Sequence, residues 1–303
     1  MRWEGNRESD NVEDRRDEDM GGGGFGGGGG GGFGIGGGRT IGIGAVVVAL
    51  LGWGVFGINP LTTLGLLSGG SPQVQQRPQP SGPAHKPPAN DQSAAFVSTV
   101  LASTEDVWSQ IFQQAGASYT PPRLVLYRGV TPTACGTGQA AMGPFYCPGD
   151  RKVYLDMDFF DTMSRQLGAP GEFARAYVVA HEVGHHVQNL QGITGKVDAM
   201  RGRISQTQQN ALSVRVELQA DCYAGIWANK SQQAKNWLDQ GDIESALNAA
   251  NHIGDDTLQR QQGGVVRPDS FTHGSSAQRV RWFTQGYKTG NVQACDTFNA
   301  QSL

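Results

Sequence analysis

The sequence predicts a mainly helical α+β domain behind a single N-terminal transmembrane helix. Three observations in the 303 residues support this fold class. Residues 40–58 are apolar and uncharged, two short runs between residues 122 and 160 have the β-branched and aromatic character of strands, and helical spacing of apolar residues dominates the remainder. A helix-rich chain with a small sheet near its front is typical of the α+β class.

Residues 1–38 do not have the composition of a packed domain. Residues 1–20 combine four arginines with eight acidic residues, and residues 21–38 are almost pure glycine. Such sequence buries too little apolar surface to offset the entropy that is lost on ordering. We therefore expect a disordered, flexible tail.

Residues 39–60 contain the apolar segment, TIGIGAVVVALLGWGVFGI from Thr40 to Ile58. Its length is close to the roughly 20 residues that a helix needs to cross a bilayer. The segment before it is long, acidic and glycine-rich, unlike the short basic start of a signal peptide. We therefore expect a retained transmembrane helix in contact with the lipid bilayer through residues 40–58, followed by a Pro/Gln/Ser-rich linker at 61–92.

Cysteine and arginine positions predict the orientation. All four cysteines, Cys135, Cys147, Cys222 and Cys295, follow the apolar segment, and an even number on one side suits an oxidising compartment. Five arginines precede or abut the segment, which favours a cytoplasmic N-terminus. We expect a single-pass protein whose folded domain is extracytoplasmic, on the periplasmic or cell-surface side. A Cys135–Cys147 bridge would leave Cys222 and Cys295 as a second pair, with unpaired thiols as the alternative.

Residues 93–303 are expected to form one folded domain. Strands are predicted at 122–129 and 152–160, and helices at 93–116, 161–167, 170–192, 211–227, 232–240 and 243–251. Acidic and basic residues balance beyond residue 39, so no nucleic-acid partner is expected.

The segment AYVVAHEVGHHVQNLQG, residues 176–192, combines titratable and apolar side chains. His181 and His185 are four residues apart, so on a helix they share a face and can converge on one ion. Glu182 would lie beside that ion rather than among its ligands. This spacing is typical of a zinc site with a general base. Two partly exposed histidines are the alternative, but the apolar run before His181 predicts burial, and buried histidines need partners.

A later helix offers the missing ligand, because a catalytic zinc takes three protein ligands and keeps one open position. In VELQADCYAG, Glu217 can reach the ion, and Asp221 can accept the other ring N–H of a ligating histidine. A solvated helix face is the alternative. The apolar surroundings argue against it, since a lone carboxylate pair there would be costly.

Three strings, GPFYCPGDRKVYLDMDFF, GEFARAYVVAHEVGHHVQNLQGI and VELQADCYAG, closely resemble the bacterial "putative neutral zinc metallopeptidase" family, the YpfJ type. The resemblance covers most of the chain from Phe96 onward and the N-terminal anchor arrangement. It implies a zincin-like domain in a membrane-anchored protein. Zincins with a glutamate third ligand pair His-Glu-x-x-His with a downstream Glu-x-x-Ala-Asp, which residues 217–221 match.

Further polar residues have weaker assignments. His186 points elsewhere on the helix, so a structural role is expected. His273 and Arg279 lie in FTHGSSAQRVRWF, and some glutamate zincins use a late His or Arg to steady the oxyanion. We assign that catalytic role to His273, with capping or packing as the alternative. Asp255 and Asp256 are expected to cap a helix rather than to bind a cation.

Together these residues predict one catalytic Zn²⁺ held by His181, His185 and Glu217, with Glu182 as general base in the hydrolysis of a peptide or protein substrate. The strand at 152–160 could pair with extended substrate. The rival is a membrane-tethered binding or scaffold module with structural or no zinc. Glu182 argues against it, because a structural site needs no such carboxylate. Hydrolysis of a non-peptide amide would use identical residues.

Overall fold

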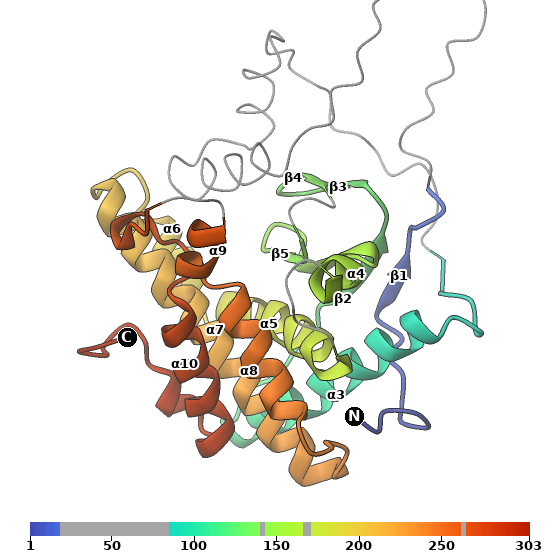
Figure 1. The fold of residues 1–303 in the computed structure, drawn as a ribbon. Coiled ribbons are helices and arrows are strands. Elements are labelled where there is room, and N and C mark those ends of the chain that lie inside the picture. The colour runs from blue at the N-terminus through green and yellow to red at the C-terminus, as the bar shows by residue number, and fades with distance from the viewer. Residues whose placement is uncertain (19–84, 140–142, 166–170, 262–264) are drawn as a thin grey trace, which may run out of the picture.

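The computed structural model describes residues 1–18, 85–139, 143–165, 171–261 and 265–303 (Figure 1). The predicted glycine-rich tail, transmembrane helix and most of the linker lie outside these residues. None of the helices described is both long and apolar enough to be a membrane span. The predicted mainly helical α+β class is confirmed for the folded part of the chain.

A four-stranded sheet forms one side of the domain, in the order β1 (Val12–Asp14), β2 (Arg123–Tyr127), β6 (Lys152–Asp156) and β5 (Phe145–Cys147). β1, β2 and β6 are parallel, and β5 is antiparallel to β6. A separate hairpin pairs β3 (Val130–Thr133) with β4 (Gly136–Gln139) between the two predicted strands. β5 is therefore the edge strand of the four-stranded sheet next to β6.

The strand predicted at 152–160 is shorter than expected. Asp156 ends β6, and its carboxylate accepts hydrogen bonds from the backbone N–H of Asp158 at 2.9 Å and of Gly129 at 3.0 Å. The first of these satisfies an N–H at the start of α4 (Asp158–Arg165), so the chain turns into a helix there. β6 also has β2 on one side and β5 on the other. The hypothesis that this strand pairs with substrate is therefore wrong.

The prediction of disorder is wrong for residues 1–18, because this segment packs on the domain. β1 pairs with β2, and Asp14 forms a bridge with His85. Of the two acids on this strand, Glu13 has partners far away in the sequence, since it binds Lys152 at 2.8 Å and Arg123 at 2.9 Å. Asp14 is bound by the nearby Arg16 at 2.5 Å. A prediction from local composition takes no account of partners that are distant in the sequence. A chain that crosses a bilayer once within residues 19–84 cannot keep this packing, since the two parts would lie on opposite sides.

Helices form the other side of the domain, with α5 (Glu172–Leu190) next to the sheet and α7 (Gln206–Lys235), α8 (Asp242–His252) and α10 (Ser276–Thr289) beyond it (Figure 1). α3 (Gln92–Gln114) packs against α5 and α7. The remaining short helices are α6 (Ile193–Asp198), α9 (Asp255–Gln261), η2 (Pro268–Ser270) and η3 (Val292–Cys295). α7 runs on to Lys235, so the separate helix predicted at 232–240 is wrong.

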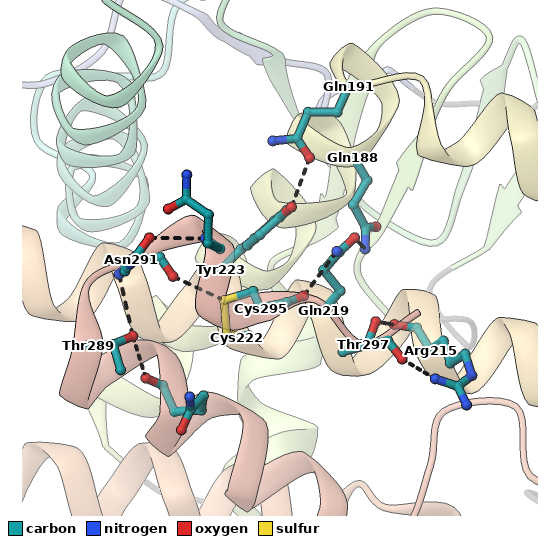
Figure 2. The surroundings of a disulfide bond; sticks show 12 residues. Gln188, Gln191, Arg215, Gln219, Cys222, Tyr223, Thr289, Asn291, Cys295 and Thr297 are labelled. Carbon is teal, nitrogen blue, oxygen red and sulfur yellow. Dashed lines mark hydrogen bonds between the residues drawn. A yellow bond between two sulfur atoms is a disulfide. The ribbon is translucent and has the colours of Figure 1, made fainter. Parts of the chain in front are cut away.

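Close backbone approach fixes how α7 and α10 cross. A Cβ built on Gly225 would collide with the carbonyl of Phe283, and one on Gly286 with the carbonyl of Cys222. Only glycine permits this approach at both positions. Close to this crossing, Cys222 of α7 is bonded to Cys295 (Figure 2). In the strand region, Cys135 is bonded to Cys147, so both predicted disulfides are confirmed.

Candidate metal centre

The structure brings His181, His185 and Glu217 together. The two Nε2 atoms are 3.2 Å apart, and the Glu217 carboxylate oxygens lie 3.2 Å from Nε2 of His181 and 3.6 Å from Nε2 of His185. One ligand atom from each residue lies within 4.8 Å of the other two. The predicted ligand set therefore converges at the contact between α5 and α7.

Gly184 makes this convergence possible. A Cβ at Gly184 would lie 3.0 Å from the carbonyl oxygen and 3.1 Å from Cα of Ala220, which is tighter than ordinary contact. Gly184 sits between the two histidines, and Ala220 sits between Glu217 and Asp221. This close approach brings the carboxylates of α7 to the imidazoles of α5.

In their neutral forms, both imidazoles would present an unprotonated Nε2 to the centre. Nδ1 of His181 lies 2.8 Å from Oδ1 of Asp221, and Nδ1 of His185 lies 2.9 Å from Oε1 of Gln188. Each acceptor holds the ring proton at Nδ1, so the lone pairs of the neutral rings face each other and require a cation. Two nitrogens on one tetrahedral zinc are about 3.3 Å apart for bonds of 2.0–2.1 Å. The observed separation and the His₂Glu donor set fit zinc.

Asp221 belongs to a buried polar group on the outer side of His181. It accepts from Tyr177 Oη at 2.5 Å and from Arg279 at 2.8 and 2.9 Å. Burial opposes ionisation, but the charges of Arg279 and His181 prevail and lower the pKa of Asp221 to about 2. Burial would likewise lower the pKa of His181, yet Asp221 and Glu217 raise it to about 10 in the metal-free protein. A proton thus takes the place of the cation.

Glu182 is buried beside the ligand pair. Burial disfavours its charged form and raises the pKa of the carboxyl, although His185 and His181 oppose this shift. Glu182 is next to a ligand on α5 but is not one of the three clustered groups. Glu182 is thus buried beside the ligand pair without belonging to it, and its role as general base stays a prediction.

His273 lies on a loop that Asp255 organises. One carboxylate oxygen of Asp255 accepts the backbone N–H groups of Thr272, His273 and Gly274 at 2.7, 2.7 and 3.0 Å. The other lies 3.2 Å from Nδ1 of His273. His185 and His181 outweigh burial and lower the pKa of Glu217, and the charge of His273 adds to this shift. The side chain of His273 is 47% exposed. Asp255 therefore orders this loop rather than capping a helix.

Three other residues have structural positions. Asp256 accepts from the backbone N–H of Ser276 at 2.7 Å and so caps the start of α10, as expected. Arg279 is buried, and its guanidinium donates to Asp221 and to the Tyr177 hydroxyl. His186 lies between Thr120 O at 2.7 Å and Tyr146 Oη at 3.1 Å, and burial lowers its pKa to about 4, which agrees with its expected structural role.

Sequence reasoning missed Gln188. It is fully buried and holds His185 much as Asp221 holds His181. Its position three residues after His185, one turn along the same face, is the signal that could have identified it.

Comparison with known proteins finds a family whose description names zinc. A family model described as "Putative neutral zinc metallopeptidase" matches residues 1–298. Uncharacterized protein YpfJ of Escherichia coli K12 is 50% identical over 302 residues, which are 98% of this chain and 99% of that protein. Uncharacterized protein Rv2575 of Mycobacterium tuberculosis H37Rv is 43% identical over 220 residues, 69% of this chain and 73% of that protein. No solved structure matches the chain.

Proposed function

The chain belongs to the putative neutral zinc metallopeptidase family, and from that premise we propose that it is a zinc-dependent peptidase with a zincin-like catalytic domain. The observation that carries the proposal is the convergence of His181, His185 and Glu217 beside the buried Glu182. The substrate class is peptides or proteins, as the family description implies.

Each residue has a defined task in the proposed reaction. Zinc held by His181, His185 and Glu217 would supply a Lewis acid that polarises the scissile carbonyl and acidifies water. Glu182 accepts the proton of the attacking water and later donates it to the departing amine. Asp221 keeps the proton of His181 on Nδ1 and so preserves the ligating lone pair.

His273 is the proposed donor to the developing oxyanion. Its Nδ1 lies 3.0 Å from Thr272 Oγ1 and 3.2 Å from Asp255 Oδ1, which leaves Nε2 of the half-exposed ring to face a substrate. A donor at such a position is worth about 2.7–4 kcal/mol of transition-state stabilisation.

Extended substrate would pair with β5, the free edge of the sheet. β5 contacts α5, and Tyr146 on this strand accepts a hydrogen bond from Asn189 of α5 at 2.9 Å. A peptide that extends the sheet there would run along the helix that carries the histidines.

The proposed location of the catalytic domain is extracytoplasmic. Two disulfides in the folded domain support an oxidising compartment. Residues 1–18 pack on this domain, so the proposal puts them on the same side. Contact with a bilayer through residues 40–58 stays a prediction.

Substitution of the general base tests the function. Glu182→Gln should abolish hydrolysis of a casein or peptide-library substrate, while the zinc content stays near that of the parent. Retained turnover would remove Glu182 as the base. Chelation separates the peptidase from the scaffold: loss of hydrolysis with an unchanged circular dichroism spectrum supports the enzyme, whereas unfolding supports a structural metal.

A further inference from the structure

A line of buried amides connects the candidate ligand His185 to a disulfide. Gln188 Oε1 lies 2.9 Å from Nδ1 of His185, and Gln188 Nε2 donates to Gln219 Oε1 at 3.1 Å. Gln219 Nε2 donates to the carbonyl of Cys295 at 3.0 Å, and Cys295 is bonded to Cys222 on α7 (Figure 2). Gln188, Gln219 and both cysteines are buried, so water does not compete for these bonds.

Two backbone carbonyls determine which way each amide faces. Gln188 Nε2 also donates to the carbonyl of Val216 at 2.7 Å, and a carbonyl can only accept. The NH₂ group of Gln188 must face α7, and its oxygen must face His185. The carbonyl of Cys295 fixes Gln219 in the same manner. Turning either amide over would set oxygen against oxygen at a carbonyl in a dry interior.

This polarity determines the proton position on His185. Gln188 Oε1 has no proton to give, so Nδ1 of His185 must be the donor. The neutral ring then carries its lone pair on Nε2, the atom that faces Nε2 of His181 at 3.2 Å. The amides thus hold the tautomer that a metal ligand needs.

The disulfide fixes the far end of the line. Cys295 lies on η3, after α10, and its carbonyl is the last acceptor. On the far side of η3, the Thr297 hydroxyl donates to the carbonyl of Arg215 at 2.6 Å, and the Arg215 guanidinium donates to the carbonyl of Thr297 (Figure 2). The C-terminal segment is therefore attached to α7 on both sides of Gln219.

We propose that Gln188 and Gln219 are positioning residues for the zinc ligand His185, and that the Cys222–Cys295 disulfide holds the line in place. The proposal rests on the proposed function to the extent that zinc occupies this centre. Loss of an outer partner of a metal ligand typically costs 10–100-fold in metal affinity. The line predicts a loss of this size at Gln188, although that side chain touches neither metal nor substrate.

The test measures zinc affinity of the full chain by competition with a chromogenic chelator. Gln188→Met should weaken zinc binding on the order of 10–100-fold, and Gln219→Met should weaken it less. The double variant should bind zinc no more weakly than Gln188→Met, because both substitutions interrupt one line. Cys222→Ser with Cys295→Ser should also weaken binding, whereas Cys135→Ser with Cys147→Ser should not. Gln191→Met is the matched control, since Gln191 directly follows the same helix but accepts a hydrogen bond from Tyr223.

Parent-like zinc affinity in a folded Gln188→Met variant would overturn the proposal, and so would fully additive losses at Gln188 and Gln219. The ring nitrogen shifts of His185 give a second readout that needs neither zinc nor substrate. At a pH where the ring is neutral, they should report the Nδ1–H tautomer in the parent and a mixture in Gln188→Met. A mixture of the two His185 tautomers in the parent protein would overturn the proposal. An Nδ1–H tautomer in a parent that binds no zinc supports the line and rejects the proposed function.

Discussion

Arg279 holds Asp221 through two parallel hydrogen bonds, 2.8 Å from Nε to Oδ2 and 2.9 Å from Nη2 to Oδ1. Both side chains are buried, and Asp221 in turn holds His181. The pair carries opposite charges in an interior where neither would be stable alone. The sequence left the role of Arg279 open, and the structure makes it the partner of Asp221, the residue behind a ligand.

Removal of Arg279 should therefore destabilise the fold. Arg279→Met leaves the Asp221 carboxylate buried without its cation, which should lower the free energy of unfolding by about 3–5 kcal/mol in urea titrations. The exposed Arg281→Met is the matched control and should change it by less than about 0.5 kcal/mol. Equal effects of the two substitutions would show that the buried pair contributes nothing specific.

The sequence predicts the residues of the candidate metal centre better than the buried residues that hold them in place. His181, His185, Glu217 and Asp221 follow from helical spacing, because residues four apart on a helix share a face wherever the helix packs. Gln188 shares a helix face with His185, but the groups that orient its amide, the Val216 carbonyl and Gln219, come from another helix. Arg279 likewise depends on which helices cross, and local spacing contains no such information. The order of residues 1–18 escaped for a similar reason, since Glu13 is neutralised by Lys152 and Arg123 from distant strands.

Glu217 should be required for zinc binding. Glu217→Ala removes one of three ligands, so the purified protein should retain little zinc and its affinity should fall by more than 100-fold, beyond the typical effect of an outer partner. Glu244→Ala, an exposed acid on α8, should leave metal content unchanged. Zinc content measured by atomic absorption checks both. Unchanged affinity in Glu217→Ala would exclude this residue from the ligand set.

Glu13 should make stability depend on acid pH. Burial alone would raise the pKa of Glu13, but Lys152 and Arg123 outweigh this effect. The pKa of Glu13 is therefore lower in the folded protein than in the unfolded chain. The stabilisation is thus complete above the ordinary pKa of about 4.5 and is lost as pH falls through the folded value. Glu13→Gln should cost about 2 kcal/mol at pH 7, since its partners are partly exposed. Urea titrations should converge for parent and variant at low pH, and a constant difference would contradict this origin.

His273 should affect turnover without affecting metal binding. If His273 is the oxyanion donor, His273→Gln should lower kcat by about 10²–10³-fold at unchanged zinc content. Burial alone would lower the pKa of His273, but Asp255 and Glu217 raise it above its ordinary value. If the charged ring is the donor, activity of the parent falls as pH rises through that pKa, and the variant lacks this decline. Asp255→Asn should reproduce part of the loss. Full activity in His273→Gln would leave the ring a packing role.

Residues 1–18 should lie on the same side of any membrane as the folded domain. Asp10 and Lys86 form an exposed ion pair at 2.7 Å, and four cysteines are already bonded. A short bismaleimide should therefore link cysteines in the Asp10→Cys, Lys86→Cys double variant within one chain, and neither single variant should react in this way. Linkage in intact cells, detected as an altered peptide map, is the expected result because β1 is part of the sheet. Linkage only after purification would mean that the two segments are separated by the membrane in the cell and that β1 docks after its release.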